Sequence, residues 1–387
     1  MSNPSLSSLL PAGFADTLPP DAAHEAFVLE TLIATFSSNG YQRVKLPLLE
    51  FEDSLFSGTG VEMTEQTFRL MDPISQKMMG VRADMTPQIA RVATTRLADD
   101  PRPLRLCYGG QVLRVKGNQL RSKRQFTQAG VELIGAKSPA ADAEVILMAI
   151  SALSSLGIHE VSVDLGLPSL IPELIAECEL DGSTIEDLRI ALDRKDSADV
   201  LNISKDVGSK AESLFPTLLN SAGEAEVTLK TLKTLNLGDK GNKQRERLQQ
   251  VVNMVRTDAP NIGLTIDPVE NRSFKYHAGV TFAFYTRGIQ GELGSGGRYI
   301  AGNKIDGEQS TGLTLFMDTV INAAPPQLSK KRIFIPLETP KIKTQELHHM
   351  GWITVSAIEK NVDLKSEALR LNCDSYLSSQ GIKDTKT

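Results

Sequence analysis

Two long strand-like segments joined by a polar loop constrain the fold of this 387-residue chain more than any other feature. Residues 104–115 (LRLCYGGQVLRV) and 126–135 (FTQAGVELIG) have the length and the apolar content of β-strands. The intervening segment, GNQLRSKRQ, is polar and is typical of a hairpin loop. Because strands joined in this way pair antiparallel, the sequence predicts an antiparallel pair here.

Helical segments precede and follow this hairpin. Residues 21–38 carry apolar side chains at helical spacing between a Pro-Pro pair and Asn39-Gly40, and residues 140–156 carry a second apolar stripe. Further strands are expected at 41–50, 159–166, 263–268, 279–293 and 311–321, with the glycine cluster Gly294, Gly296 and Gly297 separating the last two. Antiparallel strands with helices before and after them predict the α+β class rather than alternating βαβ units.

The chain is long enough for about two or three domains. Residues 167–261 are rich in charge and helical in pattern, with turns expected at 221–228 and 237–242, and we interpret them as a helical insertion in a core of residues 1–325. The stretch Ala-Ala-Pro-Pro-Gln at 323–327 is typical of a linker. Residues 326–387 then form a short α/β element, which is expected to dock on the rest because its size is marginal for independent folding.

The composition excludes several classes of protein. A hydrophobic content of 41% is too high for a disordered chain, and no apolar run approaches the length of a membrane-spanning helix. The N-terminus lacks the basic start and apolar stretch of a secretory signal, so a cytoplasmic protein is expected. A formal net charge of -5 argues against nucleic-acid binding as the main function.

The cysteines and histidines predict neither a metal site nor a disulfide framework, and no cofactor is expected. The residues in question are far apart or lack ligand and nucleophile spacing: Cys107, Cys178, Cys373, His24, His159, His348 and His349.

The hairpin loop is strongly basic. Between positions 114 and 124 it holds five cationic residues and no acidic one: Arg114, Lys116, Arg121, Lys123 and Arg124. So much like charge needs either water or phosphate oxygens around it. From composition alone, a solvated loop and an anion site remain open as interpretations.

Two segments place polar side chains together. In RADMTPQIAR, an extended chain would point Asp84 and Thr86 to one face, and Gln128 and Glu132 share a face of the strand FTQAGVEL. A carboxylate that faces a core needs a partner, which is either a cationic ligand or a hairpin arginine. The glycine pair in SGGRYI (295–300) permits close backbone approach, either to a ligand or to a packed helix.

In this order, the segments resemble the catalytic core of class II aminoacyl-tRNA synthetases, specifically that of histidyl-tRNA synthetases. Residues 21–47 resemble the first family motif, a helix and a strand ending in proline at a dimer interface. The hairpin YGGQVLR…RSKRQFTQAGVELIG resembles the second motif, in which Arg114 is similar to the arginine that holds the α-phosphate of ATP. RADMT resembles Arg-Pro-Glu-Gly-Thr, which implies that Asp84 and Thr86 face the amino group of histidine.

The resemblance extends over about residues 11–325. It implies that Gln128 and Glu132 are the polar residues of a histidine pocket. ENRSFKYHAGVTFAFY is similar to the histidine-specific loop Arg-Gly-Leu-Asp-Tyr-Tyr, and the matching positions are Arg272, Tyr276 and His277. SGGRY likewise resembles Gly-Gly-Arg-Tyr-Asp.

The departures from the synthetase pattern concern catalysis and tRNA. Thr319 stands where the third motif has an arginine that clamps the γ-phosphate, and Phe316 stands where it has a glycine. Lys116 replaces a glutamate that meets adenine, and Ser273 and Lys275 replace a glycine and an aspartate of the histidine-specific loop. The C-terminal element is about half as long as an anticodon-binding domain, so tRNA is not an expected partner.

A retained pocket beside a lost catalyst resembles one paralogous family, the regulatory subunits of ATP phosphoribosyltransferase. The resemblance implies a non-catalytic role in the first step of histidine biosynthesis. It further implies a self-dimer, a hetero-octamer with the short-form catalytic subunit, activation of that subunit, and feedback inhibition by L-histidine. Asp84, Thr86, Gln128 and Glu132 would hold the effector, with Tyr276 and His277 closing over its imidazole.

Some assignments stay open. The effector could instead bind at the interface with the catalytic subunit. Arg114, Arg121 and Arg124 could bind ATP or phosphoribosyl pyrophosphate, or could contact the partner. The alternative functions are a histidyl-tRNA synthetase-like ligase with a degenerate third motif and a synthetase-like module that modifies another protein.

Overall fold

The computed structural model describes residues 9–117, 121–178, 181–270, 277–302, 307–326, 330–360 and 362–386. The chain forms two compact units, Met1–Pro325 and Pro326–Thr387. Among the described residues, no helix is both long and apolar enough to span a membrane.

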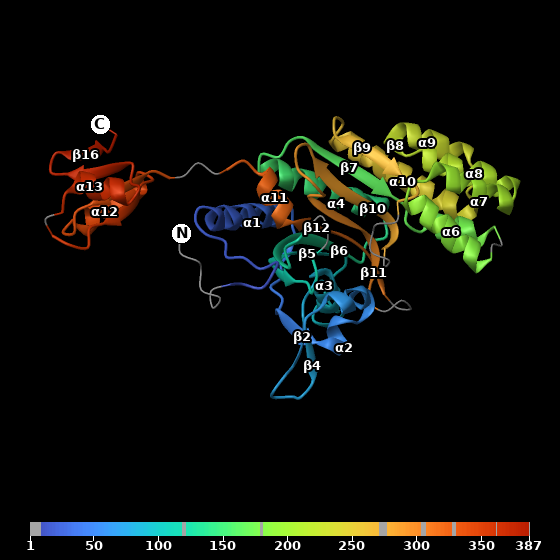
Figure 1. The fold of residues 1–387 in the computed structure, drawn as a ribbon, viewed down its shortest axis with the longest axis horizontal. Helices are drawn as coiled ribbons and strands as arrows, with labels where there is room; N and C mark the ends of the chain where they lie inside the picture. The colour runs from blue at the N-terminus through green and yellow to red at the C-terminus, as the bar shows by residue number, and fades with distance from the viewer. Residues whose placement is uncertain are drawn as a thin grey trace. The chain divides into compact units, whose positions relative to one another are not determined.

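A nine-stranded sheet is the centre of the first unit (Figure 1). Its strands lie in the order β1 (Gln42–Arg43), β5 (Leu104–Leu113), β6 (Gln125–Ile134), β12 (Glu308–Phe316), β11 (Gly294–Ala301), β10 (His277–Thr286), β7 (Val161–Gly166), β9 (Gly263–Asp267) and β8 (Gly223–Glu224). The pairs from β5 to β7 are antiparallel, whereas β1–β5 and β7–β9 are parallel. The α+β prediction is confirmed.

The two faces of this sheet are covered by different helices. α1 (Asp21–Ser38) buries Val28, Leu32 and Phe36 and packs on α4 (Pro139–Ser155). Odd-numbered residues of β6 join this core, while even-numbered ones face α3 (Thr86–Thr95), because side chains alternate along a strand. Gln128 and Glu132 therefore lie on the α3 side.

The described part of residues 167–261 is mainly helical, with the short strand β8 between two of its helices, and these helices gather at the β9–β8 end of the sheet in Figure 1. They are α5 (Leu170–Ala176), α6 (Gly182–Asp193), α7 (Ser197–Val207), α8 (Ser209–Asn220), α9 (Ala225–Thr234) and α10 (Gly238–Asp258). The turn expected at 237–242 is wrong beyond Leu237, because α10 starts at Gly238. Asp239 in its first turn faces the positive end of the helix dipole, which favours helix there.

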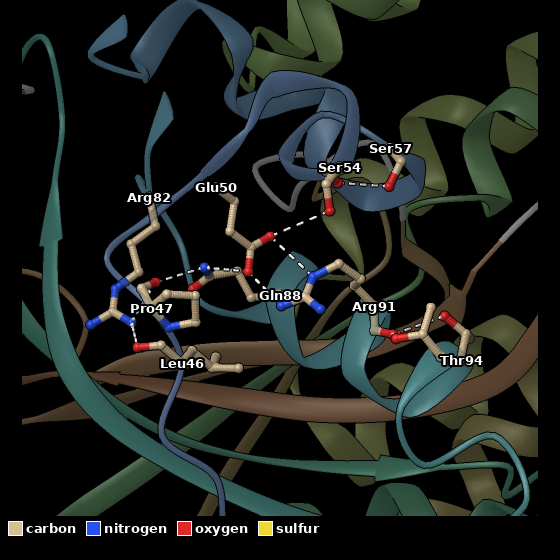
Figure 2. Close-up of polar contacts among 10 residues, drawn as sticks. Leu46, Pro47, Glu50, Ser54, Ser57, Arg82, Gln88, Arg91 and Thr94 are labelled. Carbon is tan, nitrogen blue, oxygen red and sulfur yellow. Dashed lines mark hydrogen bonds and ion pairs between the residues drawn. The ribbon is translucent and has the colours of Figure 1, made fainter. Parts of the chain in front are cut away.

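A small three-stranded sheet and short helices carry the residues before α3. The order is β2 (Leu49–Phe51), β4 (Met78–Val81) and β3 (Arg69–Met71), accompanied by α2 (Glu52–Leu55) and the 3-10 helix η2 (Gly58–Gln66). Figure 2 shows how they are attached: Glu50 accepts hydrogen bonds from Gln88 and Arg91 of α3. Arg82 donates to the carbonyls of Leu46 and of Gln111 in β5, so the segment entering α3 is fixed to the large sheet.

The second unit has a four-stranded sheet in the order β14 (Ile353–Ser356), β13 (Arg332–Ile335), β15 (Ser375–Ser378), β16 (Gly381–Asp384). α12 (Lys341–His349) and α13 (Leu364–Arg370) contribute to two separate small cores, one containing Leu347 and the other Ala368. The hairpin β15–β16 was not among the expected elements.

Two expectations at the end of the first unit are wrong. The expected strand 311–321 ends at Phe316, and α11 (Met317–Ala323) follows it. A short apolar run does not distinguish strand from helix. The glycine cluster does not separate strands but lies within β11. A Cβ at Gly296 would lie 2.1 Å from the carbonyl oxygen of Gly312 on β12, so neither a ligand nor a helix is needed to explain that glycine.

Candidate functional site

A cavity opens on the α3 side of the sheet, between β6, β11 and β12. The polar and aromatic side chains that line it include Asp84, Thr86, Glu132, Tyr299, Thr314 and Phe316. The space is about 20 Å³, which is room for about one water molecule. This enclosed space alone is too small for an amino acid.

Glu132 reaches the cavity because the neighbouring strand has no side chain in its way. Gly312 is its register partner on β12, and a Cβ there would lie 1.8 Å from the Glu132 carboxylate. The Glu132 carboxylate accepts hydrogen bonds from the hydroxyls of Thr86 at 3.0 Å and Tyr299 at 2.8 Å. It makes no ion pair with a described residue, so the hairpin-arginine interpretation is wrong for this carboxylate.

Burial sets the protonation of Glu132. The side chain is 1% exposed, and loss of hydration raises the pKa of its carboxyl group to about 8. The hydrogen bonds from Tyr299 and Thr86 oppose this rise in pKa, and the charge of Asp84 adds to it. At neutral pH the unliganded group is therefore mostly protonated.

Asp84 lies two residues before the start of α3. Its carboxylate accepts from the backbone N–H of Thr86 at 2.8 Å and from the Gln128 amide at 3.0 Å. Gln128 in turn accepts from the backbone N–H of Met85. The extended conformation expected for this segment is wrong from Thr86 onward, because Thr86 is the first residue of the helix, yet both side chains still line the cavity.

The hairpin arginines each face a different neighbour. The Arg114 Nε donates to the Ala83 carbonyl, and its buried Nη2 has no hydrogen bond with any described residue and lies 3.9 Å from an Asp84 oxygen. Arg124 donates to the Ala12 carbonyl and lies over the rings of Phe14 and Phe68. With Arg121 also largely buried, the solvated-loop interpretation is wrong for these three residues.

Three positions implied by the resemblance cannot be compared with the cavity. Arg272 and Tyr276 lie outside the described residues, and His277 is described only by its backbone at the start of β10. Sequence reasoning missed Tyr299 and Tyr108, although Tyr299 lies two residues after the glycine pair within SGGRYI. The Tyr108 hydroxyl lies 2.7 Å from that of Thr314, so it braces the cavity wall.

Comparison with known proteins decides the family. Residues 13–320 match the sequence model of a family described as "Histidyl-tRNA synthetase". A protein of Paramagnetospirillum magneticum named ATP phosphoribosyltransferase regulatory subunit is 49% identical over 98% of both chains. One of the same name from Rhodospirillum centenum is 48% identical over 96% of this chain and 94% of its own. The chain belongs to the family of ATP phosphoribosyltransferase regulatory subunits.

Solved structures agree with this family in fold. An ATP phosphoribosyltransferase regulatory subunit/histidyl-tRNA synthetase from Bacillus halodurans superposes with a TM-score of 0.82 at 24% identity, covering 97% of this chain and 98% of its own. A histidyl-tRNA synthetase from Nostoc sp. PCC 7120 gives 0.80 at 18% identity, covering 98% and 95%. Regulatory subunits therefore share the synthetase fold.

Thr319, the residue that the resemblance matched to the synthetase arginine, has a structural role in this chain. Its hydroxyl is bonded to the carbonyls of Glu292 and Phe316, and the side chain is 8% exposed. It joins the end of β12 to the turn before β11 and carries no charge.

Proposed function

We propose that the chain activates the short-form catalytic subunit of ATP phosphoribosyltransferase in the first step of histidine biosynthesis, and makes that enzyme sensitive to histidine. The chain itself catalyses no transfer in this proposal. Near-full-length relatives carry the name regulatory subunit, and Thr319 offers no charge for a phosphate clamp.

The observation that carries the histidine-binding part is the pair of buried carboxyl groups in one cavity. Asp84 and Glu132 are 5% and 1% exposed, and among the described residues the only ion-pair partner within 4 Å of either is Arg114, whose Nη2 lies 3.9 Å from Asp84. An α-ammonium group between them would supply the missing charge and lower the pKa of Glu132. The ligand's carboxylate would then face the Nη2 of Arg114, which has no hydrogen-bond partner in the described part of the chain.

The narrow cavity suits an effector rather than a permanently bound group. A ligand shifts an assembly only through different affinities for its states, and a cavity of about 20 Å³ must widen to bind histidine. Widening against the Thr86 and Tyr299 hydrogen bonds would give the liganded state a different geometry of α3 and β11.

The assembly follows the family resemblance. We expect a self-dimer through α1 and the segment up to Pro47, and a hetero-octamer with the catalytic subunit. Residues 326–387 are proposed to be a shortened form of the anticodon-binding domain. Arg114 is proposed as a remaining anion site for the effector carboxylate or a phosphate.

The test is the rate of phosphoribosyl-ATP formation by the short catalytic subunit, with and without this chain, across histidine concentrations. Stimulation that histidine reverses is the expected result. Histidine-dependent exchange of pyrophosphate into ATP by this chain alone, without stimulation, would favour the synthetase-like ligase instead.

A substitution at Glu132 tests whether histidine binds in this cavity. Glu132→Ala in the reconstituted complex is expected to raise the inhibitory histidine concentration by about tenfold or more, since a buried charged hydrogen bond contributes about 1.5–3 kcal/mol. Glu186→Ala, at an exposed pair with Arg189 in α6, is the control. Unchanged inhibition in Glu132→Ala would place the effector elsewhere, for example at the interface with the catalytic subunit.

A further inference from the structure

Arg121 reaches back from the hairpin loop and packs against a wall of the cavity. Its side chain is only 9% exposed, less than that of Arg114 at 17%. The guanidinium carbon lies 3.4 Å from the centroid of the Phe316 ring, which is stacking distance for a cation on an aromatic face.

Two acidic residues fix Arg121 in this position. Its Nε lies 3.5 Å from a carboxylate oxygen of Asp318, in the first turn of α11. Its Nη2 donates to the backbone carbonyl of Glu292 and lies 3.8 Å from that residue's carboxylate. The loop is therefore tied to the end of β12 and to the turn before β11, and both strands border the cavity.

Phe316 belongs to both the cavity and the core. It lines the cavity with Glu132 and Thr314, is 4% exposed, and packs in the cluster that contains Tyr108 and Tyr299. The cavity wall at Phe316 is thus two layers deep, with the aromatic ring inside and the guanidinium behind it.

We propose that the Arg121–Phe316 stack limits the ligand of this cavity to an amino acid with a free carboxylate. The inference rests on the proposed function, because it takes the ammonium group at Asp84 and Glu132 and the carboxylate at Arg114. Phe316 lines the cavity together with Asp84, and the Nη2 of Arg114 lies 3.9 Å from Asp84, so a substituent on the ligand's carboxyl carbon has to find room beside the stack. Esters, amides and acyl phosphates of the amino acid are excluded, whereas the free acid fits once the cavity widens.

The experiment is isothermal titration of the full-length chain with L-histidine and with its N-butyl amide. The wild type is expected to bind the free acid at least about tenfold more tightly than the amide. In Arg121→Ala the preference is expected to fall by about tenfold, because the wall loses its outer layer. The amide lacks the carboxylate charge that faces Arg114, and this weakens its binding to both proteins equally. Comparing the ratio of amide to free-acid dissociation constants between the two proteins therefore cancels that effect.

Lys123→Ala is the matched control, because Lys123 is an exposed cation of the same loop and should keep the wild-type preference. If Arg121→Ala does not fold, Phe316→Leu tests the same wall and is expected to reduce the preference in the same direction. A folded variant at Arg121 or Phe316 with an unchanged preference overturns this inference alone. Failure of histidine to bind the wild type, alone or with the catalytic subunit, overturns the pocket assignment and the inference with it.

Discussion

The protonation of Glu132 makes the stability of the folded chain depend on pH. Its pKa is about 8 in the folded chain, chiefly because the group is buried, against an ordinary value of 4.5. Between these two pH values the folded chain binds more protons at this site than the unfolded chain does. The contribution of this group to stability is therefore complete below pH 4.5 and is lost as the pH rises through about 8.

Replacing this acid should remove that dependence. We expect Glu132→Gln to lose less stability than the wild type between pH 5 and 9, by up to about 1.4 kcal/mol for each unit of the pKa difference. Urea unfolding at several pH values measures this. Parallel curves for the two proteins would contradict the raised pKa, and Glu308→Gln, at a half-buried pair with Arg102, serves as the comparison.

Some of the residues that line the cavity could be predicted from the sequence. Alternation along one strand placed Gln128 and Glu132 on the same face, because a period of two is a local property. The contacts of Glu132 with Thr86 and Tyr299 could not be predicted, since they depend on the order β6–β12–β11 of the folded sheet. Nor could charge counting show that Arg121 packs on Phe316.

At the scale of elements, a buried charge cluster joins the insertion to the sheet. Asp142 of α4 is fully buried and pairs with Arg298 of β11 at 2.8 Å and with Arg247 of α10 at 2.9 Å. Arg298 also donates to the carbonyls of Ala136 and Ser138. One carboxylate thus holds two arginines from elements far apart in the sequence.

Removing that carboxylate should be strongly destabilising. Asp142→Asn leaves the buried Arg298 without its counter-charge, and the free energy of unfolding is expected to fall by about 3–5 kcal/mol. The exposed pair of Glu186 with Arg189 is the control, where Glu186→Gln should change stability by less than about 1 kcal/mol. Chemical denaturation followed by circular dichroism compares them, and equal losses would show that the cluster does not hold these elements.

Elements with a strong local pattern were predicted well. The helix expected at 21–38 is α1 with the same bounds, and the two hairpin strands are β5 and β6. Elements whose type depends on tertiary contacts were not: α11 was taken for strand, and β15–β16 was missed because four-residue strands carry little periodicity.

At the scale of the whole molecule, each unit has its own apolar cores. Among the described residues, the two clusters of the first unit end at Ala324, and the two of the second begin at Ile333. A unit with its own core can fold alone if it buries enough surface, and the first unit is much the larger.

We therefore expect a chain that ends at Pro325 to fold. It should unfold cooperatively on heating and bind histidine with a dissociation constant within about threefold of the full chain, that is, within about 0.7 kcal/mol. Calorimetry and titration test this, and stimulation of the catalytic subunit by the shortened chain shows whether residues 326–387 serve activation. An aggregated or unfolded product would mean that the second unit is needed for folding.

Gly312 also has a consequence for how the sheet assembles. Its pairing with Glu132 leaves no room for a side chain, and its neighbours on β12 are Thr311 and Leu313. If β12 slipped by one residue during folding, a threonine or a leucine would meet the Glu132 carboxyl group, and every side chain of the strand would change face. The glycine that makes space for the acid therefore also disfavours the shifted strand registers. The central strands reach their correct register and the cavity forms in the same step of folding.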